Sequence, residues 1–139
     1  MPDLKTAVAF VTGASSGIGR ATARLLAEEG AKVACAARTV EKLEALVREI
    51  EGAGGTAVAV ECDVADSGSV ERAIDETIRA LGVPNVVVAN AGINGTWAPI
   101  DELTPDEFEK TIRTNLTGTY LTLHHAVPHM KKKGGGGGG

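Results

Sequence analysis

The sequence predicts an α/β fold in which helices cover both faces of a doubly wound parallel sheet. Short apolar runs alternate with longer segments in which apolar residues recur at helical spacing. A glycine-rich turn follows the first apolar run, and only 3% of the residues are aromatic, so Ala, Val, Leu and Ile form most of the core. Strands and helices that alternate in this order form right-handed crossovers and a parallel sheet.

The first strand is expected over residues 7–12, where nearly every side chain is small or apolar. A turn rich in glycine follows, and a helix begins after it. Gly30 is placed to end that helix. The expected apolar stripe of the helix consists of Ile18, Ala21, Leu25 and Leu26.

The strand and helix then repeat twice. The second strand is expected over residues 33–37 and the third over 57–60. Asp66 is a good N-cap for the third helix, and Gly82 ends it. The second helix has a stripe of Leu43, Leu46, Val47 and Ile50, and the third has Val70, Ala73, Ile74, Thr77, Ile78 and Leu81.

A fourth strand is expected over residues 86–89, and it breaks into a loop at 90–95. It must lie on the other side of the first strand, which gives the order 3-2-1-4. Ligands of such sheets bind outside the carboxyl ends of the strands, where the order reverses. Thr12, Asp63 and Asn90 all follow or end strands at that place.

A long helix is expected from Asp106 past Leu123. The residues 104–107 supply an N-cap threonine, a proline at the first helical position and a capping-box glutamate. Pro128 is expected to bend or end this helix, because proline lacks a backbone N–H group.

Length and charge limit the class of protein. The 139 residues, 43% of them hydrophobic, suffice for one globular domain, which we assign to residues 1–133, with a polyglycine tail at 134–139. The net charge of −4 disfavours a nucleic-acid partner. No apolar run is long enough for a membrane span and no signal peptide is recognisable, so we expect a cytoplasmic protein.

The turn after the first strand reads Thr12-Gly13-Ala14-Ser15-Ser16-Gly17-Ile18-Gly19. Gly13 permits a tight exit from the strand, Gly17 lets the backbone approach a phosphate, and Gly19 lets the helix pack closely on the sheet. The turn lacks the Gly-Lys-Ser/Thr ending of a triphosphate-binding loop, which disfavours a kinase or an ATPase. It predicts that amide groups at the helix start bind a dinucleotide pyrophosphate.

Together with Asp63-Val64, Asn90-Ala91-Gly92 and Asn115, this turn makes residues 7–125 similar to the N-terminal half of the short-chain dehydrogenase/reductase family, whose fold is of the Rossmann type. The resemblance implies that Asp63 accepts a hydrogen bond from the adenine amino group and that Val64 offers its backbone nearby. It implies that Asn90, Ala91 and Gly92 border the cofactor ribose. The remaining expected cofactor contacts are Gly13, Ser15, Ser16, Gly17, Ile18 and Gly19. The chain departs from the family pattern at Ala89, where a second asparagine is usual.

Asn115 is the one candidate catalytic residue. Phe108 and Ile112 place it on the apolar face of the long helix, where an unpartnered amide costs about 1–3 kcal/mol. In the family that the chain resembles, the matching asparagine helps hold a water in the proton relay. A hydrogen bond between helices is the alternative interpretation.

The choice of cofactor depends on the end of the second strand, where NAD-binding proteins of this fold carry an acidic residue. Here that position is Ala37, and Arg38 follows it. A guanidinium pairs well with the additional phosphate of NADP, and Ser15 offers a hydroxyl nearby. We therefore expect a preference for NADP, with a merely solvated Arg38 as the alternative.

The resemblance implies chemistry that needs a tyrosine acid/base, a lysine four residues later and a serine. No Tyr-x-x-x-Lys occurs here, and the only tyrosine, Tyr120, is interpreted as a packing residue. We expect the complete enzyme to transfer hydride between a nicotinamide cofactor and a small carbonyl or secondary alcohol, and the 139-residue chain alone to be inactive. The alternative is a noncatalytic dinucleotide-binding or interaction module.

Further expectations concern packing and partners. The sheet is expected to be incomplete beyond the fourth strand, and the apolar edge at 86–88 favours a homo-oligomer. Cys35 and Cys62 are expected to be buried free thiols. His125 and His129 lack acidic or cysteine neighbours, so no metal site is expected. Trp97 either lines a substrate pocket or covers the core.

Overall fold

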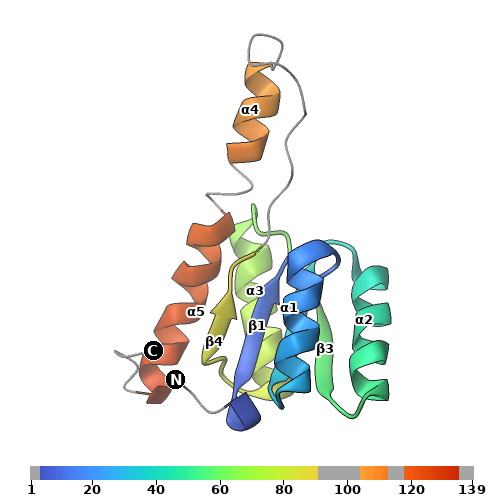
Figure 1. Cartoon of the computed structure of the whole chain (residues 1–139). Helices are drawn as coiled ribbons and strands as arrows, with labels where there is room; N and C mark the ends of the chain where they lie inside the picture. The colour runs from blue at the N-terminus through green and yellow to red at the C-terminus, as the bar shows by residue number, and fades with distance from the viewer. Residues whose placement is uncertain (1–3, 91–103, 113–117, 135–139) are drawn as a thin grey trace.

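The computed structural model of the chain describes residues 4–90, 104–112 and 118–134 (Figure 1). Its sheet has four parallel strands in the order β3-β2-β1-β4, as predicted. The central strand β1 pairs with β2 on one side and with β4 on the other, so that Phe10 lies between Ala34 and Val87. The strands are β1 (Val8–Thr12), β2 (Lys32–Ala37), β3 (Thr56–Glu61) and β4 (Val86–Val88).

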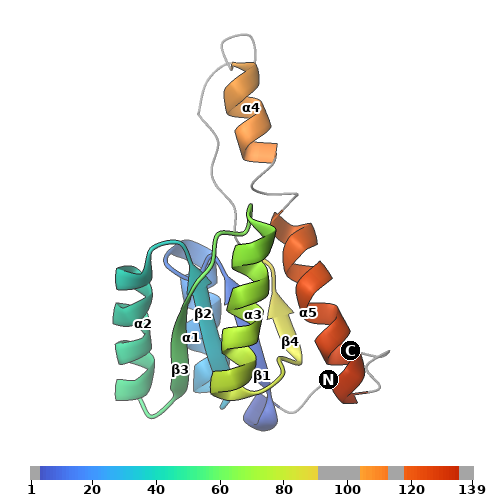
Figure 2. The same cartoon turned by 180° about the vertical axis from the view of Figure 1, so that it is seen from behind.

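Helices cover both faces of this sheet. Figures 1 and 2 show α1 and α2 on one face and α3 and α5 on the other. A short 3-10 helix, η1, precedes β1. The helical segments are η1 (Leu4–Thr6), α1 (Gly17–Glu28), α2 (Val40–Gly52), α3 (Ser67–Leu81), α4 (Pro105–Ile112) and α5 (Gly118–Gly134). None of the helices in the described ranges is long and apolar enough to cross a membrane.

The side chains of each strand alternate between two cores, because successive residues of a strand point to opposite faces of a sheet. Val11 and Val33 pack in the core beneath α1 and α2, together with Leu43 and Leu46. Phe10 belongs to the other core, with Val60, Val70, Ile74 and Ala126 from β3, α3 and α5. A sheet that is buried on both faces explains why the strands read as continuous apolar runs.

The two free cysteines lie in different cores. Cys35 packs beneath α1 and α2, whereas Cys62 packs on the side of α3 and α5. Both thiols are buried, as expected, and the sheet separates them. Burial raises the pKa of each thiol to about 12, and the neighbouring Asp63 carboxylate contributes at Cys62.

The predicted apolar stripe of α1 is confirmed only at Leu26, which is partly buried and packs against the core beneath α1 and α2, whereas Ala21 is exposed. Ile18 is 77% exposed and Leu25 is 58% exposed, and the residues of α1 that are fully buried are Gly19, Ala23 and Ala27. These three small residues are four positions apart and therefore share one helix face. Because these side chains are small, the helix can lie close to the sheet. A prediction that looks for large apolar side chains does not find such a face.

The predicted caps are confirmed. The Asp66 carboxylate accepts hydrogen bonds from the N–H groups of Gly68 and Ser69 at the start of α3. The hydroxyl of Thr104 accepts the N–H of Glu107, whose carboxylate accepts the N–H of Thr104 in return.

The expected long helix corresponds to two helical segments, with residues 113–117 outside the described part. α4 ends at Ile112, and α5 extends from Gly118 to Gly134. Pro128 lies inside α5 and does not end it. A proline removes only its own N–H donor and displaces one carbonyl partner, and the residues beyond it continue the helix.

Candidate dinucleotide-binding site

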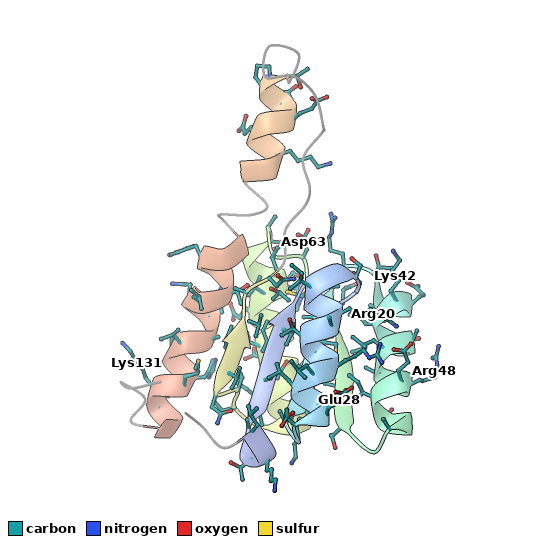
Figure 3. The ribbon with its side chains drawn as sticks, viewed as in Figure 1. Arg20, Glu28, Lys42, Arg48, Asp63 and Lys131 are labelled. Atoms are coloured by element: carbon teal, nitrogen blue, oxygen red, sulfur yellow. The ribbon has the colours of Figure 1, made fainter. Side chains whose placement is uncertain are left out.

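The candidate site lies at the carboxyl ends of the strands. β1 leads there into the glycine-rich turn and α1, and β3 leads into the segment that carries Asp63. Figure 3 shows Asp63 at the end of the sheet where α1 begins. The strand order reverses between β1 and β4, and Asn90 follows β4 at this same end. The topology thus brings together three segments that are far apart in the sequence.

The turn between β1 and α1 has a left-handed backbone at two glycines, Gly13 (φ 64°) and Gly17 (φ 59°). A side chain at either position would be strained. Ser16 is the N-cap of α1, with an extended backbone and no side-chain hydrogen bond to the first turn. Ser16, Gly17 and Ile18 are exposed, whereas Ser15 is half-buried. A helix start of this kind presents backbone donors to a bound anion.

Gly19 is the tightest point of the turn. A Cβ atom there would overlap the carbonyl group of Gly13 and come within 2.7 Å of Nδ2 of Asn90. The glycine therefore does more than permit helix packing on the sheet, because it also makes room for the Asn90 side chain. By contrast, a Cβ at Gly17 would meet nothing within 4 Å, so that this position leaves open space beside the backbone.

Thr12 connects the ends of β1 and β4. Its hydroxyl donates a hydrogen bond to the carbonyl oxygen of Val88 at 3.3 Å and accepts the N–H of Asn90 at 2.9 Å. The side chain is buried, with 1% of its surface exposed. Sequence reasoning noted Thr12 only as a strand end. The signal for its role is a polar residue that closes an otherwise apolar strand immediately before the glycines.

Asp63 is half-exposed and is held by local hydrogen bonds. Its N–H donates to Oγ of Ser69 at 2.9 Å, and its Oδ1 accepts the N–H of Ala65 at 3.0 Å. Val64 beside it is buried. One carboxylate oxygen of Asp63 thus stabilises the turn after β3, which leaves the other oxygen for a ligand.

Ala37 and Arg38 stand at the end of β2. The side chain of Ala37 is 8% exposed, and its carbonyl oxygen accepts the N–H of Cys62 at 2.9 Å. Arg38 is exposed at the approach to α2. The end of β2 therefore presents a guanidinium and a methyl group, without a carboxylate at position 37.

Another arginine near the turn is engaged elsewhere. Arg20, in the first turn of α1, lies 2.8 Å from each carboxylate oxygen of Glu49 on α2 (Figure 3). The pair joins the first turn of α1 to the last turn of α2 on one face of the sheet. Because Arg20 is paired, Arg38 is the better candidate for a ligand phosphate.

Several predicted residues lie outside the described part of the chain. These are Ala91, Gly92, Trp97 and Asn115. Among the described residues, no group of three or more His, Cys, Asp or Glu side chains could hold a metal ion. Tyr120, interpreted from the sequence as a packing residue, is instead 62% exposed on α5, and its ring stacks on that of His124 with a centroid distance of 5.3 Å.

A separate hollow of about 230 Å³ lies between the C-terminal ends of α1 and α2. Arg24, Glu28, Glu49 and the glycines at 30, 54 and 55 contribute to its lining. It belongs to the end of the sheet opposite the glycine-rich turn, since the two helices run antiparallel to the strands. This hollow is therefore distinct from the candidate site.

The fold and the strand-end site define a dinucleotide-binding protein of the Rossmann type. The chain belongs to the short chain dehydrogenase family, whose sequence model matches residues 7–137. The family consists of oxidoreductases that use NAD or NADP.

Known relatives agree with this assignment. The chain is 44% identical over 123 residues to cis-4-hydroxycyclohexanecarboxylate dehydrogenase of Sinomonas cyclohexanicum, covering 88% of this chain and 49% of the relative. It is 51% identical to a solved 3-ketoacyl-ACP reductase of Sinorhizobium meliloti 1021, with a TM-score of 0.86 and coverage of 91% of this chain and 50% of that one. A metagenomic short-chain oxidoreductase solved in complex with NADP is 40% identical, with a TM-score of 0.85 and coverage of 94% and 59%. The chain spans about half the length of the curated relatives it matches.

Proposed function

We propose that this chain is the cofactor-binding half of an NADP-preferring oxidoreductase that transfers hydride between the nicotinamide and a small carbonyl compound or secondary alcohol. The observation that carries the proposal is the lack of room for a side chain at Gly19, where Gly13 and Asn90 both lie too close for a Cβ atom and the turn therefore lies against the end of β4. The open space at Gly17 and the uncapped start of α1 fit a pyrophosphate. We expect the protein to act in the cytoplasm.

We assign the candidate residues to different parts of the bound cofactor and to the proton relay. The backbone of the turn, including Gly13, Ser15, Ser16, Gly17, Ile18 and Gly19, holds the pyrophosphate and the adjacent ribose. The Asp63 carboxylate accepts a hydrogen bond from the adenine amino group, and the Val64 backbone lies beside it. Asn90, Ala91 and Gly92 border a ribose, and Asn115 orders a water of the proton relay. When bound, the cofactor supplies or accepts the hydride.

The preference for NADP rests on Ala37 and Arg38. A guanidinium makes charge-assisted hydrogen bonds to a phosphate, and a carboxylate at position 37 would repel it. The metagenomic oxidoreductase bound to NADP supports the same assignment. We expect the chain to bind NADP⁺ more tightly than NAD⁺.

Isothermal titration with both cofactors tests this preference. Removing the guanidinium by Arg38→Ala is expected to weaken NADP⁺ binding by about tenfold or more and to leave NAD⁺ binding nearly unchanged. Arg48→Ala is the matched control, because Arg48 is an exposed arginine of α2 farther from the carboxyl ends of the strands (Figure 3). Tighter binding of NAD⁺ by the unaltered chain would contradict the proposed preference.

The chemical step needs residues beyond this half. The chain has no Tyr-x-x-x-Lys, so it lacks the family's proton donor and the lysine that lowers the donor's pKa. We expect it to bind NADPH without oxidising it in the presence of carbonyl compounds. Turnover with any aldehyde or ketone would show that the chain supplies another acid/base.

The edge of strand β4 is the feature that favours association with another strand or another copy of the chain. Within the described residues, β4 pairs with β1 alone, and Val86, Val87 and Val88 are half-buried. An apolar edge strand favours pairing with a further strand. We propose that the complete protein covers this edge and is a homo-oligomer. Two measurements on the native gene product test this. Its intact mass gives the length of the chain, and its mass in solution gives the oligomeric state. A native product of only 139 residues would favour the noncatalytic module instead.

A further inference from the structure

The connection after β3 and the first turn of α3 hold Asp63 through three hydrogen bonds. The N–H of Asp63 donates to Oγ of Ser69 at 2.9 Å, and its carbonyl oxygen accepts the N–H of Asp66 at 3.0 Å. Its Oδ1 accepts the N–H of Ala65 at 3.0 Å. Backbone and side chain are therefore both fixed, although the residue lies in a connection between a strand and a helix.

These bonds leave one acceptor for a ligand. Within the described residues, Oδ2 of Asp63 has no hydrogen-bond partner, and the side chain is half-exposed at the carboxyl end of the sheet. An ionised carboxylate oxygen can only accept hydrogen bonds. The geometry therefore suits an amino donor and disfavours a carbonyl acceptor.

Ser69 is itself held in place by the helix. Its N–H donates to Oδ1 of the capping Asp66 at 3.3 Å, and the N–H of Val70 donates to the carbonyl oxygen of Asp66 at 3.0 Å. Val70 is fully buried in the core beneath α3. Ser69 is thus next to a residue that is fixed in the core, and its hydroxyl is held in one position. Its hydrogen bond therefore restricts the motion of the Asp63 backbone.

We propose that Ser69 is a positioning residue that sets the discrimination of Asp63 for an adenine amino group. The inference rests on the proposed function, since Asp63 must face the adenine. Without the Ser69 hydroxyl, the Asp63 N–H turns to water and its carboxylate gains rotational freedom. A carboxylate that can rotate away binds the adenine amino group less tightly. It is also less strongly repelled by a carbonyl group at the same position of the base. The ratio of the affinities for the amino and the carbonyl ligand therefore falls.

The experiment compares NADP⁺ with its hypoxanthine analogue, in which a carbonyl replaces the adenine amino group. Titration calorimetry gives both affinities for the unaltered chain and for Ser69→Ala. We expect the unaltered chain to favour NADP⁺ by about tenfold or more and Ser69→Ala to reduce that ratio by roughly fivefold. Ser69→Thr keeps the hydroxyl and is expected to restore the ratio. Ser67→Ala is the matched control on the same turn, because the Ser67 hydroxyl contacts His125 instead of Asp63.

The ratio of the affinities for NADP⁺ and its hypoxanthine analogue separates a positioning role from a general structural role. A variant that is merely less stable binds both ligands more weakly by the same factor, so its ratio does not change. If the unaltered chain binds NADP⁺ with the expected ratio and Ser69→Ala keeps that ratio, the positioning role is wrong and the proposed function stands. If the unaltered chain binds neither ligand, both proposals are overturned. Thermal melting checks folding, and Ser69→Cys, which keeps the volume with a weak sulfur acceptor, replaces the alanine variant if that variant does not fold.

Discussion

Thr12 holds Asn90 in position, because the Thr12 hydroxyl accepts the backbone N–H of Asn90 at 2.9 Å. The same hydroxyl donates to Val88, the last residue of β4. Nδ2 of Asn90 in turn lies only 2.7 Å from where a Cβ atom on Gly19 would stand. The hydrogen bonds of one buried threonine therefore fix the end of β4 beside the start of α1.

Replacing this threonine by valine keeps the shape and removes the hydroxyl. We expect Thr12→Val to lower the free energy of unfolding by about 1 kcal/mol, because the part-buried N–H of Asn90 and carbonyl of Val88 lose the hydroxyl that bonds to both and keep only their bond to each other. Urea denaturation measures the change. Thr12→Ser retains the hydroxyl and is expected to lose less. Equal losses in the two variants would show that the methyl group, not the hydrogen bonds, matters here.

The three glycines at 17, 19 and 52 predict three different effects of alanine. Gly19→Ala forces a shift of Gly13 or Asn90, and we expect it to destabilise the chain by about 1–3 kcal/mol and to abolish measurable NADP⁺ binding. Gly17→Ala meets no atom within 4 Å and is expected to cost about 1–2 kcal/mol for its left-handed backbone. Gly52→Ala, in the last turn of α2 and free of contacts, is the control and is expected to stabilise slightly. Melting curves and cofactor titrations rank the variants, and a neutral Gly19→Ala would contradict the contact.

A carboxylate at the end of β2 should change the cofactor. Ala37→Asp places a negative charge where the additional phosphate of NADP is expected, and we predict a shift of the NADP⁺/NAD⁺ affinity ratio by at least about tenfold toward NAD⁺. Ala53→Asp adds the same charge to an exposed position after α2 and should leave the ratio unchanged. An unchanged ratio in Ala37→Asp would place the phosphate elsewhere.

The buried thiols predict a loss of stability at alkaline pH. Their pKa is about 12 in the folded chain and 9.0 when unperturbed. Between these values the unfolded chain releases protons that the folded chain retains. The free energy of unfolding therefore has no thiol dependence well below pH 9 and falls as the pH rises from 9 toward 12, by at most about 1.4 kcal/mol per pH unit for each thiol.

Guanidinium denaturation between pH 8 and pH 10.5 measures this dependence. The double variant Cys35→Ala/Cys62→Ala is the control, because it retains every other titrating group. Its stability should decline less steeply above pH 9 than that of the unaltered chain. Parallel declines in the two proteins would mean that the thiols do not contribute.

Much of the fold follows from the sequence. Continuous apolar runs such as residues 8–12 are typical of strands buried on both faces, and the alternation with helices determines the order 3-2-1-4. Caps such as Asp66 and the Thr104/Glu107 pair are local, so that their hydrogen bonds follow from residue type and spacing.

Features that depend on three-dimensional packing could not be predicted in this way. The buried face of α1 is lined by Gly19, Ala23 and Ala27, because closeness to the sheet outweighs side-chain hydrophobicity there. The Thr12 bonds and the contact of Gly19 with Asn90 join residues more than 70 positions apart. The roles of Asp63 and Asn90 came from resemblance to a family, and their ligand contacts stay predictions.

The placement of the two cysteines on opposite faces of the sheet gives this protein a pair of built-in reporters. A reagent that alkylates thiols can reach Cys35 only when the layer of α1 and α2 opens, and Cys62 only when the layer of α3 and α5 opens. Peptide mass spectrometry after brief alkylation would therefore time the two events separately. Equal labelling rates would identify a single cooperative opening, and unequal rates would identify the layer that separates first.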